Sequence, residues 1–509
     1  MTTALTRNAA PAAAVRTGNR GSWAAVAALA RFEGRRLLLR VPVLVVLAAC
    51  AAWIGWHTTR PGDDYPVLQD ADRATQGGGL FVGLVVLVCA NHAVLRSRRR
   101  DTERHFAVLV LPPGHRTAAH ALSVVPVALV TAVGVAVQFG WEALKPGAVG
   151  RGSVAELLVA PLVVLLFGAA GVLLARLLPF TAVAPMLVVV FFLLFVGAAF
   201  PFGGERGAAW LLPVVSTSGV HPFPSALLAR PAGWHALYLA GFALTLTLAA
   251  VLVAGGRAWA VRGAFALALA ATVLGGVVQT GPLPDATTAA RARASLTPEA
   301  DQTCVRRGPS SYCAFPEWTP RVADWARIVD RVQALAGGDA HGRPLLVRQR
   351  LEARYGLDVD SALAPATRRH QVTVGTAWGG NRVPEFSTAV AGVLVAGDER
   401  AASRLCDGRM VTVMWLSLAW QSDPETELRH VRLDDSLSGD AVVLSRTEPL
   451  RMTGAQTKVV RALFHRPLYS VAARMKAHWD ELTAPGVSTS EAARLLGAKV
   501  TVGADRCGT

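Results

Sequence analysis

Residues 98–116 read RRRDTERHFAVLVLPPGHR and lie between two long apolar runs. A run of about 20 mostly apolar residues is long enough to cross a lipid bilayer as a helix. An arginine cluster between two such runs is typical of a loop on the cytoplasmic side of a membrane. The stretch therefore predicts a membrane protein in which residues 98–116 connect two spans.

Composition also favours a membrane protein. The chain has 509 residues, of which 52% are hydrophobic and 17% are charged, and its mean hydropathy is +0.38. This is too apolar for an ordinary soluble protein of the same size. The long uncharged runs fall within residues 38–281 and predict seven spans, at 38–56, 78–95, 118–140, 154–178, 181–200, 234–254 and 263–280.

The two ends of the chain have a different character. Residues 1–21 are rich in alanine and polar residues and predict a disordered cytoplasmic tail, while residues 282–509 read as a mixed α/β domain. Within that domain the patterns predict helices at 319–337, 410–420 and 488–498 and strands at 343–351 and 370–378. The expected fold is an α-helical polytopic membrane protein followed by a mixed α/β domain.

Basic residues are distributed unevenly between the two sides of the predicted spans. The N-terminus and the loops on its side carry sixteen basic residues, and the loops on the other side carry six. Because cytoplasmic loops are enriched in lysine and arginine, we expect the N-terminus in the cytoplasm of a cell-membrane protein. Seven spans then place residues 282–509 outside. The pI near 10.6 follows from this arrangement and does not require a nucleic-acid partner.

The cysteines are consistent with that orientation. Cys50 and Cys89 fall in apolar runs, and four more lie in the C-terminal domain, at Cys304, Cys313, Cys406 and Cys507. Four cysteines in an oxidising compartment fit two disulfides, with Cys304–Cys313 closing a short loop and Cys406–Cys507 a long one. Other pairings, or four reduced thiols, stay open at this point. The spacing does not match a zinc site.

Residues 22–37 precede the first span and predict an amphipathic helix. Apolar residues, including Trp23, gather on one side of a helical wheel, with Arg31 and Arg35 opposite and Arg36 beside them. Such a helix lies in the headgroup plane of a membrane, with its cations near anionic lipid. The alternative is a continuous cytoplasmic extension of the first span.

A second short helix is expected at 101–111. Asp101 and Thr102 suit a helix start, Glu103 favours the first turn through the helix dipole, and Pro112 and Pro113 are expected to end the helix. Arginines alone would fix the topology, so the ordered helix after them predicts an interaction surface.

These segments together resemble permeases of the ABC type 2 exporter family, in particular actinobacterial members. The resemblance covers about residues 23–280 and rests on ARFEGRRLLLR before the first span and on NHAVLRSRRRDTERHFAVLVLPPGHRTAAHAL between the second and third. It implies that 22–37 is an elbow helix and that 101–111 couples to a separate ATPase subunit. The residues that match the coupling region are Arg100, Asp101, Thr102, Glu103, Arg104, Leu111, Pro112 and Arg116. The family core has six spans, so the seventh span and the exported domain are a departure.

The resemblance implies a transport subunit rather than an enzyme. Two permease subunits, as a homodimer or heterodimer, would form the substrate path, and ATP and Mg²⁺ would bind to the partner ATPase. No G-x-x-x-x-G-K-[ST] phosphate loop occurs in the chain, and no H-E-x-x-H or G-x-S-x-G motif occurs either. No cofactor or metal is expected on this chain. The main alternative is a membrane-anchored sensor or interaction protein whose exported domain binds a ligand or partner, and a membrane-bound enzyme is a weaker one.

Overall fold

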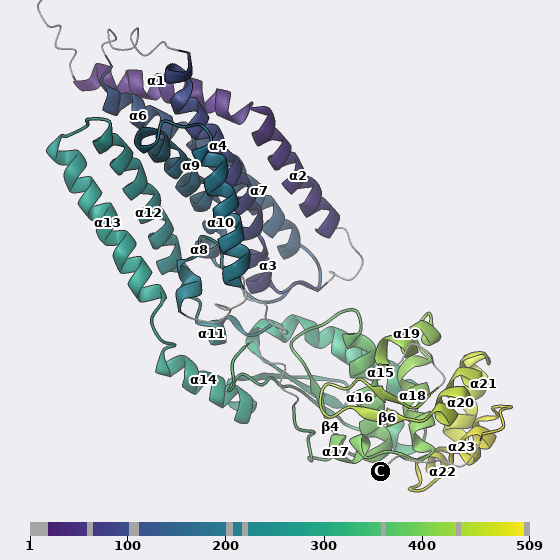
Figure 1. Ribbon diagram of the computed structural model, residues 1–509. Helices are drawn as coiled ribbons and strands as arrows, with labels where there is room; N and C mark the ends of the chain where they lie inside the picture. The colour runs from purple at the N-terminus through teal and green to yellow at the C-terminus, as the bar shows by residue number, and fades with distance from the viewer. Residues whose placement is uncertain are drawn as a thin grey trace, which may run out of the picture.

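The computed structural model describes residues 19–58, 65–100, 111–199, 207–215, 222–357, 363–433 and 439–502. A helical bundle is followed by a C-terminal domain that lies beyond one end of the bundle (Figure 1). The last bundle helix ends at Gln279, and the first helix of the C-terminal domain begins at Asp285.

Each of the seven expected spans coincides with a helix of the bundle. These helices are α2 (Val41–Thr58), α4 (Gln76–Arg99), α7 (Val125–Ala143), α9 (Val159–Leu177), α10 (Val183–Ala199), α12 (Ala232–Val253) and α13 (Trp259–Gln279). Shorter elements complete the bundle, namely α1 (Asn19–Leu38), α3 (Leu68–Ala74), α6 (Pro113–Leu122), α8 (Val154–Leu157), η1 (Ala208–Leu211) and α11 (Ser225–Leu228).

Among the described residues, five helical stretches are long and apolar enough to cross a membrane. They are Leu68–Ser97, Pro113–Ala143, Val154–Leu177, Ala232–Val253 and Trp259–Gln279. The pair α1 and α2 passes the same criterion as one span bent by 61°, which makes a sixth. The apolar part of α10, Val183–Leu194, is shorter. Length and composition thus support five or six of the seven expected spans.

The helices at the centre of the bundle approach closely because glycines face their neighbours. α9 packs between α4 and α12. A Cβ added at Gly171 of α9 would lie 2.3 Å from the Leu87 carbonyl oxygen of α4, and one at Gly79 would lie 2.6 Å from the Ala160 Cα. Asn91 of α4 also donates to the Gly171 carbonyl at 3.3 Å. Small residues and interhelical hydrogen bonds of this kind stabilise helix packing in lipid, where hydrophobic driving force between helices is weak.

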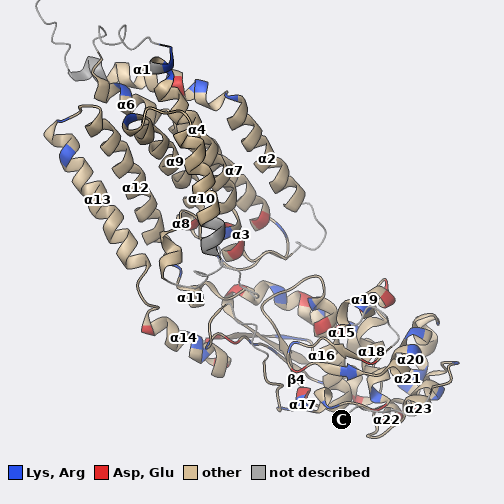
Figure 2. Cartoon of the chain, viewed as in Figure 1, with Lys and Arg blue, Asp and Glu red and all other residues tan. Residues whose placement is uncertain are grey.

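Charged residues are concentrated at the two ends of the bundle, and the middle of its long helices is free of them in the described part of the chain (Figure 2). Burying a charge in hydrocarbon is costly, so this banding is what a membrane environment requires. The apolar helices are therefore consistent with membrane insertion.

The C-terminal domain contains a small mixed sheet. Its strands follow the order β1 (Thr303–Arg307), β2 (Ser310–Ala314), β3 (Leu346–Gln349) and β4 (Gln371–Val374). β1 and β2 form an antiparallel hairpin, and β2, β3 and β4 run parallel. A separate two-stranded sheet is formed by β5 (Ala441–Val443) and β6 (Leu450–Met452). The strands expected at 343–351 and 370–378 are confirmed as β3 and β4.

Helices surround the sheet. The α-helices of the domain are α14 (Asp285–Leu296), α15 (Val322–Leu335), α16 (Arg382–Ala396), α17 (Glu399–Ser403), α18 (Arg409–Leu418), α19 (Pro424–Val431), α20 (Gly454–Phe464), α21 (Leu468–Ala477), α22 (Trp479–Thr483) and α23 (Thr489–Leu496). Three short 3-10 turns complete it, namely η2 (Pro298–Asp301), η3 (Pro316–Arg321) and η4 (Gly338–Gly342). The three expected helices are confirmed as α15, α18 and α23. α18 is buried from Met410 to Leu418, and Ser488 caps α23 by accepting from the Glu491 amide.

The predicted short-loop disulfide is present. Cys304 and Cys313 are bonded across the β1–β2 hairpin. Cys406 is disulfide-bonded as well, while Cys507, its predicted partner, lies outside the described residues. Cys50 and Cys89 of the bundle are free thiols. Disulfides confined to the C-terminal domain are consistent with an oxidising, extracytoplasmic location for it.

Candidate functional site

α1 lies across the end of the bundle that is remote from the C-terminal domain (Figure 1). It is bent by 61° from α2, so the chain turns sharply before it enters the bundle. Arg31, Arg35 and Arg36 are exposed, as the amphipathic pattern predicted. Trp23 departs from that pattern because it is 56% exposed, with its ring against His115 at a centroid distance of 5.7 Å.

The buried side of α1 packs on α6. Val26 and Ala30 form an apolar cluster with Ala119 of α6, and Leu111 packs against the same cluster. Gly34 allows α1 to approach the start of α7, because a Cβ there would lie 3.0 Å from the Pro126 ring. α6, which follows the predicted coupling segment 101–111, is thus packed against α1.

α1 is also fixed to α4 by two polar contacts. Glu33, only 8% exposed, forms a bidentate salt bridge with Arg96, with both N–O distances at 3.2 Å. Arg40, just after α1, donates to the Cys89 carbonyl at 2.7 Å. A half-buried bidentate pair has good geometry for a net stabilising contribution, unlike most exposed ion pairs.

The structure places the predicted coupling residues only in part. Arg100 is exposed directly after α4. Leu111 and Pro112 precede α6, and Arg116 lies within it. The other four, Asp101, Thr102, Glu103 and Arg104, lie outside the described residues.

The predicted helix at 101–111 lies almost wholly outside the described residues, so its expected end at Pro112 and Pro113 stays a prediction. The structure shows that these prolines begin α6, with Pro112 as N-cap and Pro113 at the first helical position. Proline suits that position because its missing N–H would have no partner inside the helix anyway.

The geometry at this end has one mechanical consequence. Arg96 lies five residues before Asp101, and Leu111 directly follows residue 110. Both flanks of segment 101–110 therefore contact α1, one through Glu33 and the other through the cluster at Val26 and Ala30. A force applied to this segment would reach α1, α4 and α6 together.

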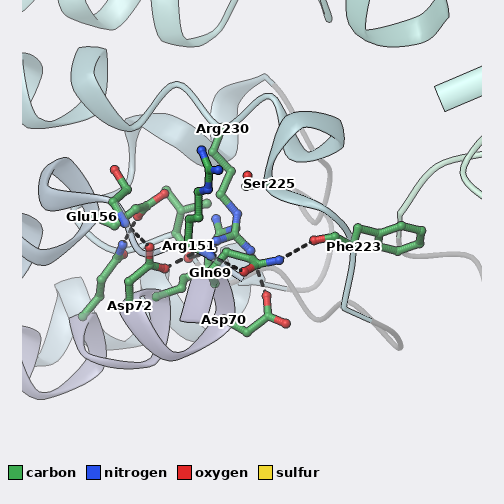
Figure 3. A network of polar contacts seen from close by, with 12 residues as sticks. Gln69, Asp70, Asp72, Arg151, Glu156, Phe223, Ser225 and Arg230 are labelled. Atoms are coloured by element: carbon green, nitrogen blue, oxygen red, sulfur yellow. Dashed lines mark hydrogen bonds and ion pairs between the residues drawn. The ribbon is translucent and has the colours of Figure 1, made fainter. Parts of the chain in front are cut away.

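A second polar site lies at the opposite end of the bundle and was not predicted (Figure 3). Asp72 of α3 is 1% exposed and accepts from the Ser153 amide at 2.7 Å. Arg230 lies 3.6 Å from Asp72 and 3.1 Å from Asp70. Glu156 of α8 is also buried and accepts a hydrogen bond from the Gln76 amide of α4. The ends of α3, α4, α8 and α12 are therefore joined by buried polar contacts.

This network continues into the C-terminal domain. The Gln69 amide donates to the Phe223 carbonyl at 2.7 Å and to the Glu317 carboxylate at 3.4 Å, and its oxygen accepts from the Arg151 amide at 3.1 Å. Glu317 also accepts from the Ser225 backbone amide at 3.1 Å. Since Glu317 belongs to η3, the C-terminal domain is tied to the loops of the bundle through buried groups.

The apolar core runs across the same junction. Val67, Val149 and Phe223 from the loops of the bundle belong to the core cluster that contains Trp318 and Trp325 of the C-terminal domain. Movement of the bundle loops would therefore be transmitted to the C-terminal domain, because tightly packed interiors are not continuously deformable.

The contacts at these two sites are salt bridges and hydrogen bonds that join helices and loops. Within the described residues no group of three or more His, Cys, Asp or Glu side chains could hold a metal ion. The sequence did not single out Glu33, Gln69, Asp72, Glu317 or Arg321 as site residues, and Glu156 was interpreted as marking the end of a span. The sequence pattern around these residues gave little indication of a site, since an isolated polar residue beside an apolar run usually marks the end of a span. Comparison with protein-family models, with curated proteins and with solved structures found no match to this chain.

Proposed function

We propose that this chain is the membrane-spanning permease subunit of an ATP-binding cassette exporter. Two such subunits form the substrate path in the cell membrane, and a separate ATPase subunit, carrying ATP and Mg²⁺, drives it from the cytoplasm. The observation that carries the proposal is that α1 contacts both flanks of segment 101–110. A loop that only fixed topology would not need its two ends fastened to one helix.

The proposed mechanism uses α4 as a rigid connection between the two polar sites. α4 has 24 residues, which corresponds to about 36 Å at 1.5 Å per residue. Arg96 lies near one end and contacts Glu33, and Gln76 lies at the other end and contacts Glu156. A displacement produced by the ATPase at segment 101–110 would thus reach the polar network at the far end and favour one of two conformations of the path.

The proposed orientation places the N-terminus and α1 in the cytoplasm and the C-terminal domain outside. The basic residues of the α1 end support it through the positive-inside bias, and the Cys304–Cys313 disulfide supports it through the oxidising compartment that such a bond requires.

The test uses the charge pair that fastens α1 to α4. The chain is co-expressed with its proposed ATPase subunit, and ATP hydrolysis by the purified complex is measured. Glu33→Arg should place two arginines together and lower ATP hydrolysis by the complex several-fold, because a half-buried charge loses its partner. The double variant Glu33→Arg/Arg96→Glu restores the pair and should restore hydrolysis.

The control is Arg35→Glu, which changes the charge of α1 by two units in the opposite direction on its exposed face. It should hydrolyse ATP like the wild type. Equal hydrolysis in the wild type, Glu33→Arg and Arg35→Glu complexes would contradict the proposed route. A chain that forms no complex with any ATPase would favour the alternative, a membrane-anchored binding protein.

A further inference from the structure

Five arginines of the C-terminal domain gather where its parallel strands begin. Arg306 and Arg307 end β1 beside the start of β2, Arg343 lies three residues before β3, and Arg368 and Arg369 lie directly before β4. We call these five residues the arginine rim. All are exposed except Arg343, which is half-buried.

The register of the sheet shows that the arginine rim extends across all four strands. Arg307 is opposite Ser310, Ser311 is opposite Leu346, and Leu346 is opposite Gln371. Neighbouring strands are about 4.8 Å apart, so the row from β1 to β4 is about 14 Å long. The rim residues therefore lie in a row along this edge of the sheet.

The rim lies at the far edge of the sheet from the bundle. The opposite ends of the parallel strands lead toward the bundle, since β2 continues into η3, where Glu317 and Arg321 contact the bundle loops. The protein's own membrane is thus not the surface that the rim faces.

Within the described residues the rim arginines have no acidic partner, unlike several other arginines of the domain. Arg293, Arg327, Arg348, Arg354 and Arg494 each form a salt bridge. In the described part of the chain no carboxylate lies within 4.0 Å of a rim guanidinium. Among the same residues, one rim guanidinium donates a hydrogen bond, from Arg343 to the Leu394 carbonyl at 3.4 Å.

Acidic side chains near the rim are few. Besides burial, Asp330 of α15 raises the pKa of the Tyr312 phenol and Arg307 lowers it, so both charges lie near that ring. Asp339 lies in η4. Asp398 caps α17, where its carboxylate accepts from the Ala401 amide. The five cations therefore outnumber their acidic neighbours.

His370 lies at the β4 end of the rim, between Arg369 and the first residue of β4. Its backbone is in the left-handed region, with φ of 58°, which is uncommon outside glycine and found at functional sites when the surroundings enforce it. Burial and then the nearby Arg343 and Arg369 lower the pKa of its imidazole below the usual 6.5. Two of the rim arginines therefore lie close enough to His370 to affect its protonation.

We propose that the arginine rim binds an extended polymer that carries phosphate groups. Guanidinium groups bind phosphate oxygens in a bidentate fashion, and a row across four strand ends fits a linear chain of anions. An acidic peptide adding to the sheet as a strand would lie along β1 and would leave Arg343, Arg368 and Arg369 unused, so it fits the row less well. The inference does not depend on the transport function.

The experiment measures binding of fluorescent polyphosphate to the full-length chain in nanodiscs of zwitterionic lipid, at several salt concentrations. For single-stranded polyanions the logarithm of affinity falls with the logarithm of salt with a slope of about −0.7 for each phosphate contacted. Five contacts predict a slope of about −3.5, so a fourfold rise in salt should weaken binding about a hundredfold.

The test variant replaces all five rim arginines with glutamine and should bind more weakly at every salt concentration, with a slope near zero. The control variant replaces five arginines that are salt-bridged in the same domain and so changes the net charge equally. These are Arg293, Arg327, Arg354, Arg461 and Arg494. The control should keep the wild-type slope. If the test variant does not fold, Arg306→Gln/Arg307→Gln alone should reduce the slope by about 1.4.

Two results would overturn the proposal. One is that the wild-type chain does not bind polyphosphate, whether or not it binds an acidic peptide. The other is an equal loss of binding in the test and control variants, because that would show a response to net charge alone.

Discussion

Arg321 should be the residue on which attachment of the C-terminal domain to the bundle depends most strongly. It is 1% exposed and donates to the carbonyls of Tyr65 at 2.7 Å and Thr376 at 3.1 Å, with longer contacts to Pro66 and Gly147, both at 3.4 Å. Three of these four carbonyls belong to the bundle loops. Burial lowers the pKa of the guanidinium to about 10, so it remains charged at neutral pH.

Arg321→Met keeps much of the apolar stem and removes the donors. A hydrogen bond to a charged group contributes about 1.5–3 kcal/mol, so losing the two short ones should cost about 3–6 kcal/mol. For a domain of this size 1 kcal/mol shifts the unfolding midpoint by about 2–4 °C, which predicts a decrease of about 6–24 °C.

The assay is thermal unfolding of the full-length chain, followed by tryptophan fluorescence, since Trp318 and Trp325 are buried beside this contact. Arg327→Met is the matched control, because Arg327 is 58% exposed and pairs only with Asp324 among the described residues. Its midpoint should stay within about 1 °C of wild type, in line with the small contribution of exposed pairs. An Arg321→Met midpoint equal to that of the control would refute the reasoning.

Three further predictions concern packing, disulfide chemistry and pH. Gly171→Leu should lower the unfolding midpoint by the equivalent of about 1–3 kcal/mol, because its Cβ would collide with a carbonyl of α4; Gly134→Leu, whose Cβ meets nothing within 4 Å, should leave the midpoint unchanged. Thiol labelling of the unfolded chain should modify Cys304 and Cys313 only after reduction, and replacing both with serine should cost about 2–3 kcal/mol from the short loop they close. Polyphosphate affinity should rise as pH falls below about 6.5, because protonation of His370 adds a cation to the arginine rim and its pKa lies below that usual value. His370→Gln should remove this rise. The same pH profile in the wild type and in His370→Gln would contradict the prediction.

The sequence was informative wherever a pattern extends over many residues. The apolar runs located all seven long helices of the bundle, and the alternation in HQVTVGTAW located β4. The Cys304–Cys313 bond was one of the pairings that the sequence left open, and the structure contains it. Burial of a whole helix face or strand dominates the free energy, so these features are visible without tertiary information.

The polar sites could not be predicted because they depend on single residues brought together by the fold. Glu33 and Arg96 are 63 positions apart, and Gln69 and Glu317 are 248 apart. In the sequence each looks like an ordinary flanking charge or amide. Only the crossing of α1 over α4, and the docking of η3 on the bundle loops, give them partners.

The central claim is that segment 101–110 contacts an ATPase in the cytoplasm. The most direct measurement is photocrosslinking in intact cells from a reactive amino acid at position 103, followed by mass spectrometry of the captured chain. A second reactive site at Gly380, in the C-terminal domain, serves as the control. The account predicts capture of a protein with a G-x-x-x-x-G-K-[ST] phosphate loop from position 103 and not from position 380. Capture of that ATPase from neither position, or from position 380, would contradict it.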